Sequence, residues 1–187
     1  MEDFKTIEES LEKLNADIKD FAESKSLVFK VITPFTLNSE VTLEEKLKNL
    51  NVKGIYFLEI KKNNEYQSFD AWSKDFKKKW DNDKIIKTPK IAEGRLKMRP
   101  QSENIDSLEW IPFYIGKSEK IKDRVVQHLT KPIDSTTSAL KLRGRKSLYG
   151  MEFRLSVIEI NTDKYDLVMH KIEQILRNKY NPIVGKH

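Results

Sequence analysis

Five polar side chains of this sequence stand where a folded chain could use them together. Tyr56 and Tyr114 each lie in a short apolar run that predicts a buried strand, and Arg124 and His128 are four residues apart. Residues at that spacing share one side of a helix. Glu173 borders the apolar positions of a second helical pattern. Together these groups offer phenols and an imidazole for proton transfer, a guanidinium for an anion and a carboxylate for a cation.

Each of these residues also has an ordinary structural explanation. A tyrosine in a strand usually packs in the core, and Arg124 with His128 could form a plain polar helix face. Glu173 could pair with Arg177, four residues further on. His170 and His187 match no catalytic pattern, and we interpret them as incidental. For any one residue taken alone, both explanations remain open.

The order of the motifs favours the chemical explanation. Gly54-Ile55-Tyr56 and Tyr114-Ile115-Gly116 resemble the two signatures of the GIY-YIG nuclease family. Arg124, His128, Glu173 and Asn181 follow in the order of the family's landmarks, and several restriction-type members place a histidine where His128 stands. The resemblance covers roughly residues 54–60 and 111–187. One departure is large: residues 61–109 separate the signature strands, which a short hairpin usually connects.

The resemblance implies a restriction-type, sequence-specific endonuclease that hydrolyses DNA with Mg²⁺, for which Mn²⁺ could substitute. Its catalytic residues would be Tyr56, Tyr114, Arg124, His128, Glu173 and Asn181, with Glu173 as the metal ligand. Tyr56 would be the general base, although a phenol with a pKa near 10 is a poor base at neutral pH. His128 accepting the Tyr56 proton and Arg124 favouring the phenolate would correct this. Tyr114 would hydrogen-bond the water or phosphate, and Asn181 would brace the site.

DNA is the expected partner, and a second copy of the chain is another candidate. The insertion at 61–109 and the basic loop after residue 140 are the expected readers of sequence, because phosphate contacts carry no sequence information. The predicted DNA-binding residues are Lys117, Lys141, Arg143, Arg145, Lys146, Arg95 and Arg99. The alternative function is a catalytically idle DNA-binding or assembly protein that retains the fold.

The elements that must position these residues predict an α+β fold with a small, mainly antiparallel, three-stranded sheet. Strands are expected at 52–60, 110–116 and 151–160, and helices at 118–129 and after the Asn161-Thr162-Asp163 cap. The insertion should hold a helix from 69 to 80. We divide the chain into an N-terminal helical extension, 1–51, and a nuclease domain, 52–187.

The N-terminal extension begins with an amphipathic helix. Its apolar residues alternate three and four apart: Phe4, Ile7, Leu11, Leu14, Ile18 and Phe21. Such a short stripe rarely holds a coiled coil alone, so packing on the domain is favoured over pairing with a second copy. A strand at 27–35 and a short helix at 42–50, opened by a capping box, should follow.

The composition sets the remaining limits. The chain has no cysteine, which excludes disulfides, thiolate metal sites and cysteine nucleophiles. Residues 1–60 carry 8 Lys and Arg against 12 Asp and Glu, whereas residues 111–187 carry 15 against 8. A basic back half suits a polyanionic partner, although a lysine-rich solvated surface explains it as well. No apolar run reaches the ~20 residues of a membrane span, and we expect a cytoplasmic protein.

Overall fold

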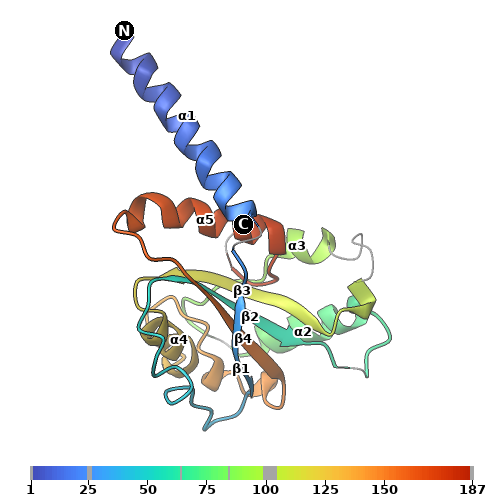
Figure 1. Cartoon of the computed structure of the whole chain (residues 1–187). Coiled ribbons are helices and arrows are strands. Elements are labelled where there is room, and N and C mark those ends of the chain that lie inside the picture. Colours follow the sequence, from blue (N-terminus) through green and yellow to red (C-terminus); the bar gives the residue numbers. More distant parts are fainter. Residues whose placement is uncertain (1, 25–26, 64, 84, 99–104, 186–187) are drawn as a thin grey trace.

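The computed structural model describes residues 2–24, 27–63, 65–83, 85–98 and 105–185. Within these ranges an antiparallel sheet of four strands forms the centre of an α+β fold (Figure 1). The strands, in the spatial order β1-β4-β2-β3, are β1 (Lys30–Thr36), β2 (Gly54–Lys61), β3 (Trp110–Ser118) and β4 (Glu152–Glu159). The predicted three-stranded sheet is one strand short, because β1 from the N-terminal segment pairs with β4.

Strand β2 is central and is buried on both faces. Ile55 and Phe57 belong to the core on one side of the sheet, and Tyr56 belongs to the core on the other. A strand that alternates between two cores reads as a continuous apolar run. At its start, a Cβ atom on Gly54 would lie 2.0 Å from the carbonyl oxygen of Ile158 on β4. Only glycine therefore lets these two backbones approach so closely.

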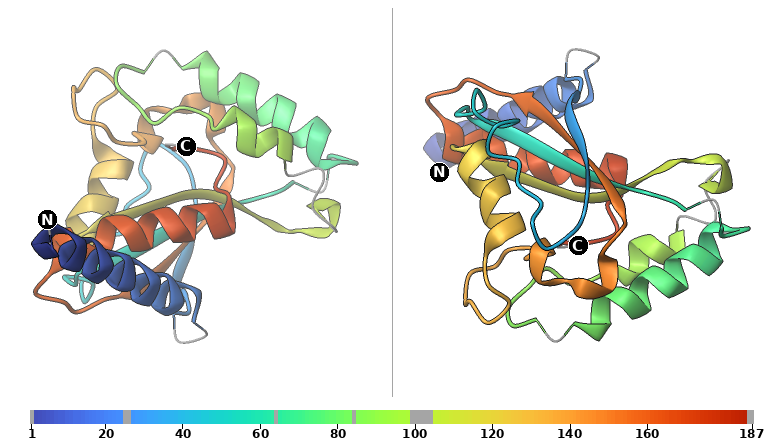
Figure 2. Two further views of the ribbon diagram at one scale, coloured as in Figure 1. Left: turned by 90° about the horizontal axis from the view of Figure 1, so that it is seen from above. Right: turned by 90° about the horizontal axis from the view of Figure 1, so that it is seen from below.

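Helices cover both faces of this sheet (Figure 2). The buried residues of α1 (Glu2–Glu23) and α5 (Tyr165–Tyr180) belong to one core, and those of α2 (Phe69–Asn82) and α4 (Ile121–Thr130) belong to the other. The short α3 (Glu93–Met98) follows α2 in the insertion. The predicted helices at 69–80, at 118–129 and after the 161–163 cap are confirmed within a few residues.

Helix α2 packs the insertion against the sheet. Its aromatic side chains are buried, and Phe76 and Trp80 contact Phe113 of β3 edge-on, at ring-centroid distances of 6.1 and 5.5 Å. Ser68 caps the helix by accepting a hydrogen bond from the backbone N–H of Ala71. The insertion is therefore anchored in the domain's own core.

The C-terminal segment closes the outer edge of β3. The backbone N–H of Ile183 donates to the carbonyl of Pro112 (3.0 Å), and that of Val184 donates to Phe113 (2.9 Å). Ala92 of the insertion in turn donates to the carbonyl of Ile183 (2.8 Å). An edge strand otherwise exposes unpaired backbone groups. The tail thus joins the insertion to the sheet beside one of the signature strands.

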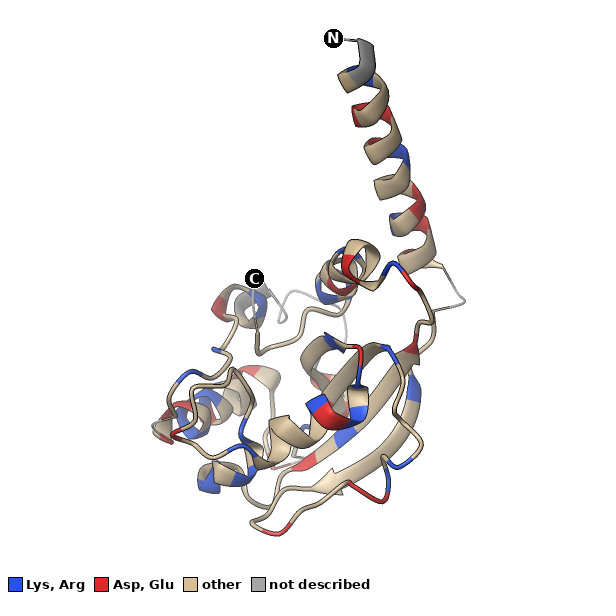
Figure 3. Ribbon diagram, turned by 90° about the vertical axis from the view of Figure 1, so that its left-hand side faces the viewer, with Lys and Arg blue, Asp and Glu red and all other residues tan. Residues whose placement is uncertain are grey.

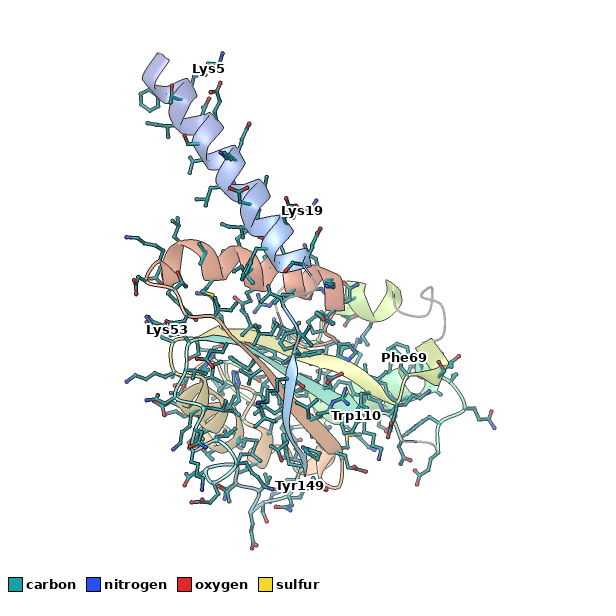
Figure 4. The ribbon with its side chains drawn as sticks, in the orientation of Figure 1. Lys5, Lys19, Lys53, Phe69, Trp110 and Tyr149 are labelled. Carbon is teal, nitrogen blue, oxygen red and sulfur yellow. The ribbon has the colours of Figure 1, made fainter. Side chains whose placement is uncertain are left out.

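Helix α1 leaves the domain instead of packing along it (Figure 1). Its base is covered, with Ile18 and Ala22 buried in the core shared with α5. Figure 4 shows the rest projecting outward, with Lys19 near the base and Lys5 near the free end. The exposed apolar side chains are Phe4 (74%), Ile7 (54%), Leu11 (51%) and Phe21 (45%). The prediction that the stripe packs on the domain is right at the base and wrong toward the tip.

Residues 44–49 form turns, not the predicted helix at 42–50, although Leu47 donates to the Leu43 carbonyl as in one helical turn (2.8 Å). No helix in the described part of the chain is both long and apolar enough to cross a membrane. Figure 3 shows charged residues of both signs along α1 and around the sheet.

Candidate active site

A cavity of about 670 Å³ brings most of the predicted catalytic residues together. Tyr56 and Tyr114 reach it from β2 and β3, Arg124 reaches it from α4, and Glu173 reaches it from α5. Lys117 lines it as well. A slightly larger groove, about 760 Å³, lies between α1 and α5 and contains none of the predicted catalytic residues. The cavity at the signature strands is therefore the candidate site.

Strand pairing explains how the two signatures form one wall. Tyr56 lies opposite Gly116 in the β2–β3 register. A Cβ atom on Gly116 would come within 2.2 Å of the Tyr56 hydroxyl, so the glycine leaves room for the ring. The rings of Tyr56 and Tyr114 stack with their centroids 6.1 Å apart. The last glycine of the second signature therefore serves the tyrosine of the first.

His128 is fully buried and holds Tyr56. Its Nδ1 accepts a hydrogen bond from the backbone N–H of Leu140 (2.9 Å), and its Nε2 lies 2.8 Å from the Tyr56 hydroxyl. A neutral imidazole has one donor and one acceptor nitrogen. Since Nδ1 is the acceptor, the proton resides on Nε2, which donates to the Tyr56 oxygen. This reverses the role expected for His128, which was to accept the Tyr56 proton.

The electrostatics of the pair agree with this assignment. Burial, and next the charge of Arg124, lower the pKa of His128 to about 3, so the ring is neutral at physiological pH. Burial, and next the neighbouring Tyr114, hold the pKa of Tyr56 well above its ordinary value, while Arg124 opposes that shift. Burial also raises the pKa of Tyr114. The resting state therefore has two protonated phenols and a neutral imidazole.

Arg124 is held at the cavity by local bonds. Its guanidinium donates to the carbonyl of Ser138 (2.7 Å) and to the side-chain oxygen of Gln127 (3.1 Å). Ser138 belongs to the loop that follows α4, so the loop fixes the direction of the guanidinium. A guanidinium beside two phenols is suited to bind an anion and to favour a phenolate.

Glu173 is only 6% exposed and pairs with Arg177, with the carboxylate and guanidinium 2.7 Å apart. Arg177 also donates to the carbonyl of Ile115 on β3 (3.3 Å), which ties α5 to the signature strand. The structural alternative for Glu173 is thus confirmed. Both residues also line the cavity, so the pair leaves Glu173 at the candidate site.

The donor set fits a magnesium site of the open kind. The described residues include no group of three or more His, Cys, Asp or Glu side chains that could enclose a metal. Mg²⁺ commonly binds one or two carboxylates and completes its shell with water and phosphate oxygens. A single carboxylate on the wall of a cavity meets that requirement, with Arg177 already balancing part of its charge.

Parts of the cavity wall were not predicted from the sequence. His170, which was interpreted as incidental, lines the cavity one helical turn before Glu173. The segment Thr88–Ile91 of the insertion forms another part of the wall. The helical spacing of His170 and Glu173 could have revealed the first, whereas only the folded chain brings the second to the site.

Asn181 lies at the end of α5 and is not among the residues that line the cavity. It adopts a left-handed backbone conformation (φ 47°), and its backbone N–H donates to the carbonyl of Arg177 (2.8 Å). Asparagine tolerates this conformation better than most residues. Asn181 therefore ends the helix that carries Glu173, and it lies outside the cavity wall.

Two of the predicted DNA-binding residues are buried in the basic loop. The Lys141 ammonium donates to the carbonyls of Ile86 and Ser135, and Arg145 donates to those of Leu140 and Trp80. The Arg145 guanidinium also stacks on the Trp80 ring at 3.3 Å. Both side chains have no exposed surface. Both charges hold the loop against the insertion, so neither side chain is exposed for the predicted contact with DNA.

The other predicted DNA-binding residues lie in different parts of the structure. Lys117 lines the cavity, and its ammonium lies 5.1 Å from the centre of the Tyr165 ring. Lys146 is exposed, and Arg143 donates to the carbonyl of Ser39 (2.8 Å). Arg95 is nearly buried on α3, where its guanidinium donates to Asn178 (3.4 Å). Arg99 lies outside the described residues.

A comparison of the chain with protein-family models, with curated proteins and with solved structures finds no match.

Proposed function

We propose that this chain is a divalent-cation-dependent endonuclease that hydrolyses DNA phosphodiester bonds in the manner of GIY-YIG nucleases. The observation that carries the proposal is the shared cavity of Tyr56, Tyr114, Arg124 and Glu173. These side chains come from four different elements, β2, β3, α4 and α5. Two phenols, a cation and a carboxylate around one space can accommodate a phosphate, a water molecule and a metal ion.

In the proposed reaction, the Tyr56 phenolate removes a proton from the attacking water. The water oxygen bonds to phosphorus as the bond to the departing 3′ oxygen breaks, and that oxygen leaves with a proton from solvent. The phenolate would be favoured by the Nε2–H donor of His128 and by the positive charge of Arg124. Tyr56 thus needs His128 as a hydrogen-bond donor, not as a proton acceptor.

Arg124 and Tyr114 would bind the scissile phosphate. The Arg124 guanidinium would neutralise charge that develops on the phosphoryl oxygens, and the Tyr114 hydroxyl would orient the water or the phosphate. Glu173 would hold Mg²⁺, with Mn²⁺ as a substitute. The bound ion would supply charge relief on phosphate and leaving group. Arg177 pairs with the Glu173 carboxylate, and both residues line the cavity.

The DNA path should run past Lys117 and the insertion. Lys117 adds a positive charge at the cavity, and Thr88–Ile91 place the insertion next to the phosphate site. Residues beside a bound phosphate are within reach of the neighbouring bases. This supports the finer proposal of a restriction-type enzyme whose insertion contributes to sequence preference.

Plasmid and phage DNA, incubated with the protein and Mg²⁺ or Mn²⁺, provide the direct test, with sequencing of the product ends. The proposal expects cleavage that chelation stops and that Tyr56→Phe and Glu173→Gln each abolish. Tyr149→Phe and Glu159→Gln are matched controls, because both residues are exposed and lie outside the cavity.

The outcomes separate the two functions. Cleavage that persists in Glu173→Gln or in excess chelator would overturn the proposed metal-dependent mechanism. DNA binding without cleavage under any cation would favour the idle DNA-binding protein. Cuts without sequence preference would leave the nuclease in place and remove the restriction-type assignment.

A further inference from the structure

The projecting part of α1 exposes a continuous apolar stripe. Only its base packs on α5, while Phe4, Ile7 and Leu11 extend along the free turns. A helical segment of this length is marginal in water without tertiary contacts. Exposed apolar side chains at heptad spacing are typical of a helix that packs against another helix. The stripe is therefore expected to pack against a partner helix.

The order of residues in the stripe identifies that partner. Read from either end, the stripe has the same sequence of side chains: Phe4, Ile7, Leu11, Leu14, Ile18, Phe21. When two copies of α1 run antiparallel, position 4 faces position 21, position 7 faces 18, and position 11 faces 14. Phenylalanine then meets phenylalanine, isoleucine meets isoleucine and leucine meets leucine. A two-fold interface requires such self-complementarity.

We infer that α1 is a dimerisation helix, which pairs antiparallel with α1 of a second copy of this chain. The two-fold axis passes between Leu11 and Leu14. Each free tip then covers the partner's base, where Phe21 is still 45% exposed. Each Ile7 extends the core that the partner's α1 and α5 already share.

The base of α1 favours the antiparallel pair over a parallel one. A parallel pair would bring two bases to the same level, each already covered by its own α5, whereas the antiparallel pair brings each base next to the partner's exposed tip. In the antiparallel pair the flanking positions bring Glu8 opposite Asn15 and Ser10 opposite Asp17. No like charges meet along those flanks, although α1 carries 8 acidic and 3 basic residues.

This inference does not depend on the proposed nuclease activity. It rests on the stripe and on the packing of α1, and its test measures assembly alone. If both proposals hold, the two sites of the dimer are related by two-fold symmetry, which is the arrangement suited to a palindromic target and a double-strand break.

Sedimentation and light scattering of the full chain provide the first test. A dimer of twice 22.0 kDa is expected. Ile7→Asp and Leu11→Asp should each produce a monomer, while Lys13→Asp, on the outer side of α1, should leave the dimer intact. Near-UV circular dichroism and thermal unfolding report whether the domain stays folded. A wild-type monomer at high micromolar concentration, or a dimer that both stripe variants preserve, would overturn the inference.

Cross-linking tests the direction of pairing. The chain has no native cysteine, so disulfides can form only between the introduced residues. Phe4→Cys and Phe21→Cys are prepared as separate variants and oxidised alone or as a mixture. Antiparallel pairing expects a covalent dimer mainly in the mixture, because position 4 faces position 21. Efficient cross-linking of each variant with itself, and no gain on mixing, would contradict the antiparallel arrangement.

Discussion

The Tyr56 hydroxyl lies 2.8 Å from Nε2 of His128, and it receives the hydrogen bond instead of giving it away. The direction is set on the far side of the ring, where the Leu140 N–H occupies Nδ1. A buried backbone N–H has a strong requirement for an acceptor, so this bond fixes the tautomer. The Tyr56 oxygen is therefore the acceptor in this hydrogen bond. A Tyr56 phenolate would already have the Nε2–H group of His128 as a donor.

This geometry predicts which substitutions of His128 are tolerated. Gln can place an amide N–H near the position of Nε2, so His128→Gln should keep activity within about tenfold of wild type. His128→Ala removes the donor and should lower the rate roughly 10²-fold or more. Single-turnover cleavage rates at saturating protein measure the effect. Equal losses in both variants would mean that Tyr56 does not rely on the donor.

The raised pKa of Tyr56 predicts an alkaline rise in activity. The reactive form is the phenolate, and burial holds the pKa of the phenol above its ordinary value. Below that pKa the phenolate fraction grows about tenfold per pH unit, and the chemical step should follow it from pH 6 to about 9. Tyr56→Phe should abolish the rise as well as the rate. A rate independent of pH over that range would exclude Tyr56 as the base.

Acid sensitivity of folding should report on His128 independently of catalysis. The folded state holds its pKa near 3 against an unfolded value of 6.5, so only the unfolded chain takes up the proton between these limits. The stability of the folded state relative to the unfolded state therefore decreases as the pH falls from about 6.5 toward 3. The titration of His128 lowers it by at most about 5 kcal/mol.

Urea unfolding at a series of pH values tests this sign. The stability difference between wild type and His128→Gln should shrink as the pH is lowered, because the variant has no imidazole to protonate. His170→Gln is the matched control, since His170 is exposed on α5. A difference that stays constant with pH would show that His128 also titrates normally in the folded state.

The Glu173–Arg177 pair predicts a link between cation binding and stability. Both side chains are largely buried, so Arg177→Gln removes a positive charge from beside a buried carboxylate and should cost roughly 3 kcal/mol. Mg²⁺ bound at Glu173 would replace part of the lost charge. Millimolar Mg²⁺ should therefore stabilise Arg177→Gln more than wild type in urea unfolding, and this gain should vanish in the Arg177→Gln/Glu173→Gln double variant. Equal effects of Mg²⁺ on all three proteins would place cation binding elsewhere.

The sequence predicts the parts of this site that follow a local period. The central strands, α4 and α5 follow from alternation and helical spacing, and they carry Tyr56, Tyr114, Arg124 and Glu173 into one cavity. The parts of the site that depend on tertiary contacts could not be predicted from the sequence. Nothing local indicates that the Leu140 N–H would set the His128 tautomer, or that β1 would pair with β4. A charge pattern also does not distinguish an exposed lysine from one that binds carbonyls in the interior.

The last prediction separates the two kinds of basic residue in the back half. Arg145 is buried against Trp80 and donates to two carbonyls and to Thr88, so Arg145→Met should destabilise the fold by roughly 2–4 kcal/mol. The affinity of the folded protein for DNA and its salt dependence should remain close to wild type. Lys117→Met should do the opposite: thermal unfolding should change little, while DNA binding weakens and the slope of log affinity against log salt falls by about one. Binding is measured with Ca²⁺ in place of Mg²⁺, across a series of salt concentrations. If Arg145→Met stays folded and shows a reduced slope of log affinity against log salt, Arg145 does contact DNA.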